Sequence, residues 1–135
     1  MKRGWIIAVV VAIGAALGVG RYMYNEKPTQ ASEKAADVES TAATLFTAFS
    51  SDETAAGKLY NDKVVQVAGT IREISKETNG PTNILLETGD PLGAVVCEFT
   101  ADQAPEWKKG MNVTVKGFCA GFNMDVLLQR CSAVE

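Results

Sequence analysis

The sequence predicts a mostly β domain, a five-stranded Greek-key barrel with helices on its N-terminal side, preceded by one transmembrane helix. The first observation is the stretch 63–74, KVVQVAGTIREI, in which apolar and polar side chains alternate as they do along a half-buried strand. The second is Gly69 in the middle of that stretch, because an interior glycine marks a bulge or bend that lets one strand join two sheets. The third is an uncharged apolar segment near the N-terminus. Strands that bend in this way close small barrels.

The charge of the chain argues against binding to a phosphate backbone. The full chain of 135 residues has a formal charge of −3, but residues 35–135 hold eight basic and fourteen acidic side chains, a formal charge of −6. Nucleic-acid-binding domains draw their affinity from a basic stripe, which an acidic domain lacks. The charge therefore makes nucleic acid a poor first choice of partner.

The sequence offers no recognisable catalytic or metal-binding set. It contains no histidine, which removes His-activated nucleophiles, His proton shuttles and His-containing metal sites. Its three cysteines lack CxxC spacing, and the spacing of Asp102, Glu106 and Asp125 matches no cation-binding loop. We therefore expect no catalysis, no cofactor and no metal.

Residues 4–20, GWIIAVVVAIGAALGVG, carry no charged side chain and predict a membrane anchor within residues 1–24. Arg21, Tyr22 and Tyr24 follow the segment, as cations and aromatic rings do at a membrane interface. Lys2 and Arg3 favour a cytoplasmic N-terminus, which places the C-terminal domain on the extracytoplasmic, periplasmic side. The alternative interpretation is a signal segment that is cleaved.

Residues 25–36 are polar and predict a tether, and residues 37–135 then form the domain. From Asp37 onward, Val38, Ala42, Leu45 and Phe49 recur at spacings of four, three and four, which predicts an amphipathic helix. Ser50 and Glu53 have the spacing of a capping box, which predicts a second helix ending near Tyr60.

After the 63–74 strand, further strands are expected at 84–87, 94–99, 112–118 and 124–131, with a loop at 119–123. One or two helical turns at 102–109 would connect the third strand to the fourth and place Trp107 against the core. Three strands, a small helix and two strands is the order that the Greek-key OB-fold barrel requires.

Three stretches resemble the tRNA_anti-like family of bacterial OB-fold proteins. They are V-x-V-x-G-T-I in the first strand, V-V-C-E-F in the third, and V-T-V-K-G-F-C-A-G-F-N-M-D-V-L-L-Q-R-C at the end of the chain. The similarity covers about residues 38–134. It implies an OB fold and an exported or membrane-attached bacterial protein, and it implies no particular activity.

OB barrels bind ligands on the second and third strands and on the loops after strands one and four, here Lys76 to Thr82 and Ala120 to Asn123. Nearby side chains could stack on a ligand or hydrogen-bond to it, and each could equally be ordinary surface. They are Arg72, Asn83, Lys116, Phe122, Asn123 and Arg130.

Cys97 and Cys131 are the pair of cysteines most able to form a disulfide, because an OB barrel places its third and fifth strands side by side. A tight turn at 120–123 would leave Cys119 too far from Cys131. The alternative is that each cysteine is a small buried apolar residue.

These features together predict a membrane-anchored, extracytoplasmic, non-enzymatic OB-fold module that binds a protein, a peptide or an envelope saccharide. One alternative is a single-stranded nucleic-acid-binding protein. Another is a structural component of a cell-envelope complex.

Overall fold

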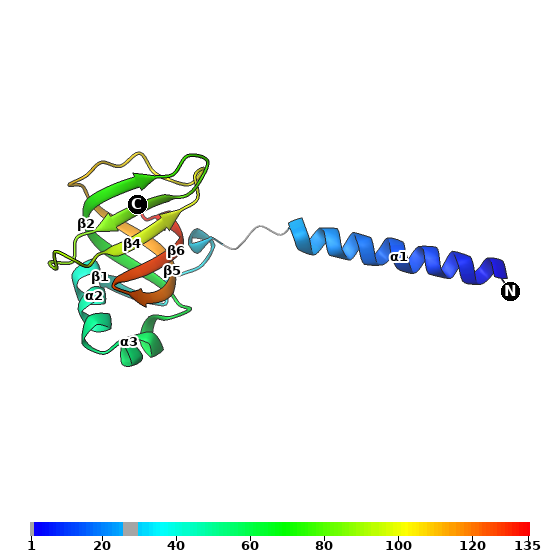
Figure 1. Cartoon of the computed structure of the whole chain (residues 1–135), viewed down its shortest axis with the longest axis horizontal. Coiled ribbons are helices and arrows are strands. Elements are labelled where there is room, and N and C mark those ends of the chain that lie inside the picture. The colour runs from blue at the N-terminus through cyan, green and yellow to red at the C-terminus, as the bar shows by residue number, and fades with distance from the viewer. Residues whose placement is uncertain (1, 26–29) are drawn as a thin grey trace.

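The long apolar helix predicted at the N-terminus is present. The computed structural model describes residues 2–25 and 30–135, and α1 (Lys2–Asn25) is its first element (Figure 1). The stretch Arg3–Met23 is long and apolar enough to cross a membrane, with a mean hydropathy of 2.0, and none of it is buried against the rest of the protein. An apolar helix of this kind near the N-terminus can be an anchor or a signal sequence.

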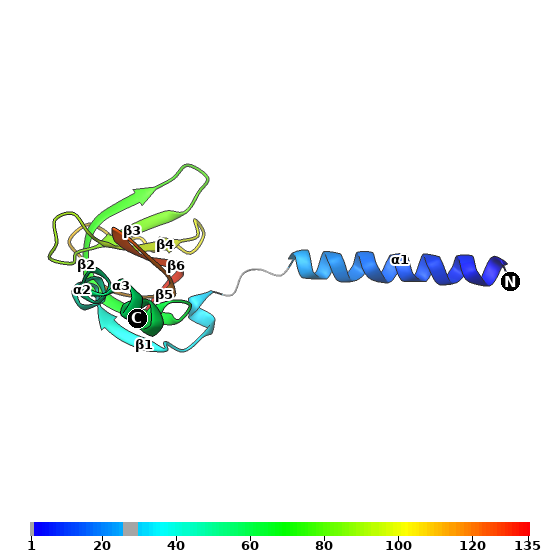
Figure 2. The same cartoon turned by 60° about the horizontal axis from the view of Figure 1, so that its bottom comes forward.

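A closed barrel forms the folded domain. Its strands are β2 (Val64–Lys76), β3 (Thr82–Leu86), β4 (Val95–Phe99), β5 (Asn112–Asn123) and β6 (Asp125–Ala133). The neighbours run β2, β3, β4, β6, β5 and back to β2, with only β4 and β6 parallel (Figures 1 and 2). This closed five-stranded arrangement confirms the predicted mostly β OB-type barrel.

β2 changes partners just after Gly69. Residues 64–70 pair with β5 and residues 71–76 pair with β3, with an irregularity just after Ile71. A Cβ atom on Gly69 would lie 3.0 Å from the Cβ of Ala42 and 3.3 Å from the Cβ of Leu86. A side chain here would force the helix start or β3 to move by a few tenths of an ångström, so the glycine lets both approach β2 closely. The strand shared between two partners, predicted from Gly69, is confirmed.

The core fills the barrel and the space under α2. Inward-facing residues of all five barrel strands are fully or nearly fully buried, and α2 adds four of its own. The largest fully buried side chains are Phe49, Phe99, Leu45, Ile71, Ile84, Leu86 and Leu128. Burial of such side chains is the main favourable term for folding.

The helix predicted from Asp37 begins later than expected. Residues Val38–Thr41 form a short strand, β1, that pairs in parallel with β2, and α2 (Ala42–Ser51) starts after it. Asp37 fixes this strand, because its carboxylate accepts from the Val64 amide at 2.9 Å and its amide donates to the Val64 carbonyl at 2.8 Å. Thr41 then caps α2 by accepting from the Thr44 amide at 3.2 Å. Pairing with β2 overrides the helical spacing of Val38.

The cap of the second helix, α3 (Glu53–Tyr60), is Asp52 and not the predicted Ser50. The Asp52 carboxylate accepts from the Ala55 amide at 3.0 Å. Ser50 still lies in α2, where its hydroxyl donates to the Thr47 carbonyl. An ionised carboxylate at the helix start also interacts favourably with the helix dipole.

The connection at 102–109 is not helical, which corrects the sequence expectation. It forms turns at residues 101–103 and 109–110, and at its end the Gly110 amide donates to the Ile71 carbonyl and the Ile71 amide donates to the Met111 carbonyl. Pro105 lacks the amide that a short helix would need. Trp107 does pack against the core, edge-on to Phe99 at 6.0 Å between ring centroids.

The loop predicted at 119–123 is also wrong. β5 continues to Asn123 and the hairpin turns at Met124, whose φ is 65°. Two irregularities in the β5–β6 ladder absorb the change of register, and Cys119 pairs with Leu128. Bulges of this kind leave no signal in the alternation of the sequence until the partner strand is known.

The segment before the barrel is attached to it. A short 3₁₀ helix, η1 (Ala31–Glu33), packs on β5 and β6, and Ala31 is 0% exposed. The predicted tether 25–36 thus includes a docked part from Gln30 onward, and its residues 26–29 lie outside the described residues.

Replacing Gly69 with valine should lower the free energy of unfolding by about 2 kcal/mol, because a Cβ there overpacks the junction between α2, β2 and β3. Urea unfolding of the full chain in micelles, followed by Trp107 fluorescence in a Trp5→Phe background, measures this. Ala68→Val, on the exposed face one residue earlier, is the control and should change stability by less than about 0.5 kcal/mol. Equal urea midpoints for the two variants would contradict the close packing of α2, β2 and β3 around Gly69.

Candidate functional site

OB barrels place ligands on the outward face of their second and third strands, here β3 and β4, and β6 extends this face by pairing with β4. Leu85 of β3 stands opposite Val96 of β4, which in turn stands opposite Leu127 of β6. All three side chains are half-buried and point away from the core. Together they form a line of apolar side chains across three strands, which we call the apolar row.

A shallow pocket of about 350 Å³ adjoins the apolar row at the β5–β6 hairpin. Its walls come from β4, β5 and β6, namely Val96, Ala120, Gly121, Phe122, Asn123, Asp125 and Leu127. Most of these groups are apolar, and polar atoms lie at the rim.

The polar side chains of β3 and β4 beside the apolar row include no lysine or arginine. Asn83 stands opposite Glu98 beside the row. Gln129 follows Leu127 on the outward side of β6. The rim therefore offers amide and carboxylate groups, which suit hydrogen bonding to a peptide or a hydroxyl group better than contact with phosphate.

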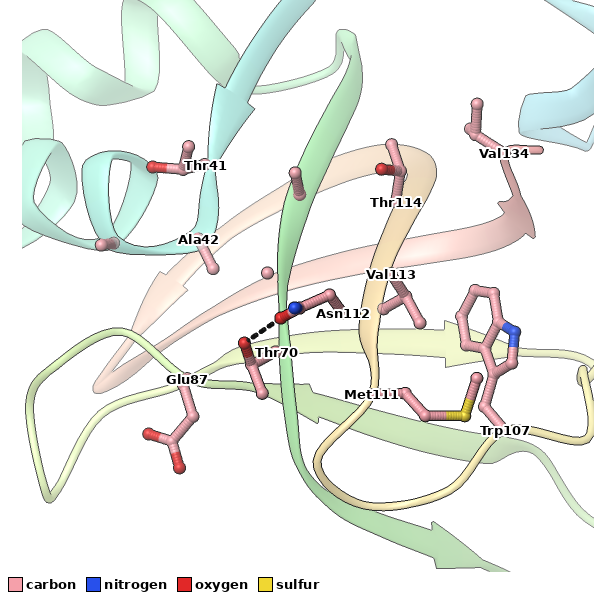
Figure 3. Close-up of a pocket in the computed structure, with 13 residues that line it drawn as sticks. Thr41, Ala42, Thr70, Glu87, Trp107, Met111, Asn112, Val113, Thr114 and Val134 are labelled. Atoms are coloured by element: carbon pink, nitrogen blue, oxygen red, sulfur yellow. Dashed lines mark hydrogen bonds between the residues drawn. The ribbon is translucent and has the colours of Figure 1, made fainter.

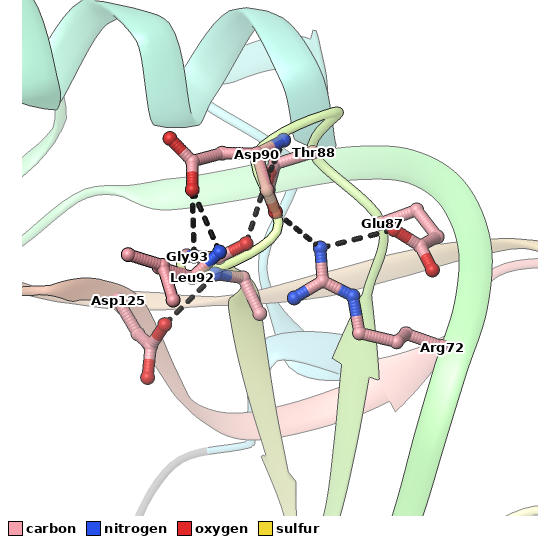
Figure 4. Close-up of polar contacts among 8 residues, drawn as sticks. Arg72, Glu87, Thr88, Asp90, Leu92, Gly93 and Asp125 are labelled. Atoms are coloured by element: carbon pink, nitrogen blue, oxygen red, sulfur yellow. Dashed lines mark hydrogen bonds and ion pairs between the residues drawn. The ribbon is translucent and has the colours of Figure 1, made fainter.

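Arg72 is held by the protein itself (Figure 4). Its guanidinium donates to the Asp90 carbonyl at 2.8 Å and lies 3.0 Å from the Glu87 carboxylate. The Asp90 carboxylate in turn accepts from the amides of Leu92 and Gly93. The arginine thus fastens the β3–β4 loop to β2, a structural role that the sequence alone did not reveal.

Two further hydrogen bonds hold the β3–β4 loop, one within the loop and one to the start of β6 (Figure 4). The Thr88 hydroxyl donates to the Gly93 carbonyl at 2.7 Å, and the Ala94 amide donates to the Asp125 carboxylate at 2.8 Å. This network orders the start of β4, which places Val96 on the outward face.

Phe122 is packed inside the protein surface rather than presented to solvent. Its ring stacks on Phe49 at 5.8 Å and meets Phe46 edge-on at 5.9 Å. The residue joins the β5–β6 hairpin to α2, and only part of it lines the shallow pocket. Asn123 is exposed at the end of β5 on the rim of that pocket.

Arg130 belongs to a different surface. Its guanidinium carbon lies 4.0 Å from the ring centroid of Phe118, and the Lys34 ammonium lies 5.5 Å from the same centroid. Distances of this size are those of cation–π contacts. We call Lys34, Phe118 and Arg130 the cationic cluster.

The cationic cluster borders its own pocket of about 420 Å³, formed also by Asp62, Cys119, Ala120 and Gln129. Ala120 lines both this pocket and the one beside the apolar row. Lys34 and Phe118 were not predicted as site residues, and the alternation of NVTVKGF, which turns Lys116 and Phe118 outward together, was the available signal. Lys116 itself pairs with Gln66 and Ser132 and lines neither pocket.

The largest of these pockets, about 630 Å³, lies where β1, α2, β2, β5 and residues 107–112 meet (Figure 3). Thr70 donates to Asn112 across it, and Trp107 and Met111 form one wall. Glu87 is the one ionisable group on its lining, and none of the predicted site residues contributes.

All three cysteines are buried thiols. Burial raises the pKa of Cys131 well above its ordinary value, and a hydrogen bond with Cys97 raises it further. Burial also raises the pKa of Cys119, against a smaller lowering by a backbone hydrogen bond from Gly121. The structure thus brings Cys97 and Cys131 into contact as free thiols, and the disulfide between them stays a prediction.

Within residues 2–25 and 30–135, no cluster of three or more His, Cys, Asp or Glu side chains could hold a metal ion.

Arg72→Gln should weaken the β3–β4 loop, because it removes the ion pair to Glu87 and the hydrogen bond to the Asp90 carbonyl. Both partners are partly exposed, so we expect a loss of about 1 kcal/mol in the free energy of unfolding. Faster hydrogen exchange at the Leu92 and Gly93 amides would report it. Lys76→Gln, at the exposed end of the same strand, is the control, and equal exchange in the two variants would contradict the role given to Arg72.

Because burial raises the pKa of both, Cys119 and Cys131 should resist iodoacetamide at pH 8 in the native protein. Mass spectrometry after labelling in urea without reductant then tests the pairing. Labelling of Cys119 alone is expected if Cys97 and Cys131 are bridged. Labelling of all three would contradict the disulfide.

Comparisons with known proteins support the fold. A crystal structure from Klebsiella pneumoniae subsp. pneumoniae MGH 78578, of a lipoprotein proposed to bind nucleic acid, is similar with a TM-score of 0.59 and 16% identity. The match covers 81% of this chain and 100% of that one. At this level of identity, the similarity shows a shared fold.

A replication protein A heterotrimer bound to single-stranded DNA gives a weaker match, with a TM-score of 0.39 and 19% identity over 53% of this chain and 57% of that one. A search of the curated proteins found no match. The tRNA_anti-like family matches residues 1–133, nearly the whole sequence. The chain therefore belongs to the tRNA_anti-like family.

Proposed function

We propose that this protein is a membrane-anchored binding module without catalytic activity, and that it binds a protein or peptide on the outward face of β3, β4 and β6. The observation that carries the proposal is the apolar row of Leu85, Val96 and Leu127, set side by side by strand pairing and surrounded by amide and carboxylate groups. An envelope saccharide would use the same polar rim.

The electrostatics of the face support a ligand that is not a polyanion. Glu98 is the one charged residue on the outward side of β4, and the neighbouring hairpin adds Asp125. The region 35–135 as a whole has a formal charge of −6. A negative face of this kind repels phosphate at long range and tolerates uncharged or basic peptides.

The anchor is the second part of the proposal. α1 has the length and hydropathy of a membrane span, and Lys2 and Arg3 before it favour a cytoplasmic N-terminus. The barrel would then lie on the extracytoplasmic side of the membrane. The name of the Klebsiella protein, a lipoprotein, is compatible with a membrane-attached setting.

Single-stranded nucleic acid is the second candidate. The cationic cluster favours it, since a ring flanked by two cations can hold a base and a phosphate, and the name of the Klebsiella protein refers to nucleic acid. It ranks second because these cations lie at the end of η1 and on β6, and not on β3 and β4.

Peptide binding can be tested with a phage-displayed library panned on the full chain in nanodiscs, with empty nanodiscs for counter-selection. Enriched peptides should bind in fluorescence anisotropy, and Val96→Glu should weaken them at least about tenfold, because it buries an unpaired carboxylate under the ligand. Ala43→Glu, on the exposed side of α2, is the control and should bind as the wild type does. Equal affinity for Val96→Glu would contradict the assigned face.

The two candidates separate by salt dependence. We expect no anisotropy change with a labelled oligothymidylate at low salt. Binding that falls steeply with added salt, and that is lost in Arg130→Gln, would favour the nucleic-acid candidate instead.

A further inference from the structure

We infer that the surface where η1, β5 and β6 meet is a second interaction surface, distinct from the apolar row, which contacts the anionic headgroups of the membrane holding α1. The inference rests on the anchor part of the proposed function. The residues of this surface are those of the cationic cluster, Lys34, Phe118 and Arg130.

The length of the connecting chain brings this surface close to the bilayer. Five Cα–Cα steps separate Asn25, the last residue of α1, from Gln30, so the two ends lie within about 18 Å of each other even if the chain is fully extended. The stretch able to span the membrane ends at Met23, only two residues before the end of α1. Whatever the tilt of α1, the bilayer surface cannot be far from Gln30.

The packing of η1 on the barrel determines which side of the barrel lies near the membrane. Ala31 is fully buried and η1 packs on β5 and β6, so the chain enters the domain at this side (Figures 1 and 2). Lys34 follows η1 directly and is exposed. The cationic cluster therefore lies beside the point at which the domain is tied to the membrane.

The chemistry of the cluster suits lipid headgroups. Cations attract anionic lipids only within about a Debye length of the surface, roughly 8 Å at physiological salt, so their closeness to the anchor is what makes them effective. An aromatic ring such as that of Phe118 can sit at the interface between headgroups and acyl chains. The pocket beside it offers Gln129 as a further donor, and Asp62 is the one acidic group on its lining.

The positive charge of the cationic cluster contrasts with the charge of the rest of the domain. Residues 35–135 are acidic overall, and other lysines, such as Lys58 and Lys109, stand exposed on α3 and on the 100–111 connection. Two cations on one ring can hold one base and one phosphate, whereas tight binding of a nucleic-acid strand uses a row of such contacts along its backbone. The two cations are enough to orient a domain that is already tied to the membrane, because the linkage supplies the effective concentration.

The test uses the full chain in nanodiscs of phosphatidylcholine alone or with phosphatidylglycerol, with a gadolinium-bearing lipid to broaden nearby amide signals. With phosphatidylglycerol, amides of residues 117–120 and 129–131 should broaden at least about twofold more than with phosphatidylcholine alone, and added salt should remove the difference. Lys34→Glu should reduce the difference by at least half, and Lys34→Glu with Arg130→Glu should abolish it. Because Lys34 is exposed, its single variant gives a result even if Arg130→Glu perturbs the fold.

Lys58→Glu with Lys109→Glu is the matched control, since it makes the same change of net charge elsewhere and should keep the full effect. Equal broadening in both lipids, in a chain that resists carbonate extraction, would overturn the inference and leave the anchor intact. Extraction of the uncut chain by carbonate would overturn both. If an oligothymidylate perturbs the cluster signals while phosphatidylglycerol does not, the surface is a nucleic-acid site and the inference is wrong.

Discussion

The passage of β2 from one partner to another is the constraint on which the barrel depends. Its first half pairs with β5 and its second half with β3, so a single strand belongs to both sides of the closed sheet. Closure requires the backbone to bend where Ala42 and Leu86 crowd it, and Gly69 leaves the space for them. β1 and α2 are then placed by β2 as well, since β1 pairs with residues 65–68 and α2 begins directly after it.

The parts of the fold that were predictable from sequence are those governed by local periodicity. The alternation of 63–74, the glycine within it and the apolar run of α1 each determine their own structure. The errors occur where a distant partner decides. Val38 fits a helical stripe, yet pairing with Val65 makes it part of a strand. β5 runs past 119–123 because bulges against β6 keep the ladder going, and a bulge cannot be read from one strand alone.

The candidate site was less predictable for a related reason. Side-chain type suggested Arg72 and Phe122 as ligand contacts, because an arginine and an aromatic ring are common in binding sites. In the structure both side chains already have partners within the protein. Arg72 contacts Glu87 and the Asp90 carbonyl, and Phe122 packs on Phe49 and Phe46. Which exposed side chains remain for a partner depends on such internal contacts. The apolar row emerges only when the register aligns Leu85, Val96 and Leu127.

The docking of η1 also bears on what would happen if α1 were removed by proteolysis. Ala31 packs against the barrel, several residues after the end of the apolar stretch at Met23. A cut between them would detach α1 while the folded domain kept every strand and both helices α2 and α3. For a domain anchored as proposed, such a cut would replace a two-dimensional search for partners along the membrane with a three-dimensional one, and the outward face of β3, β4 and β6 would be unchanged.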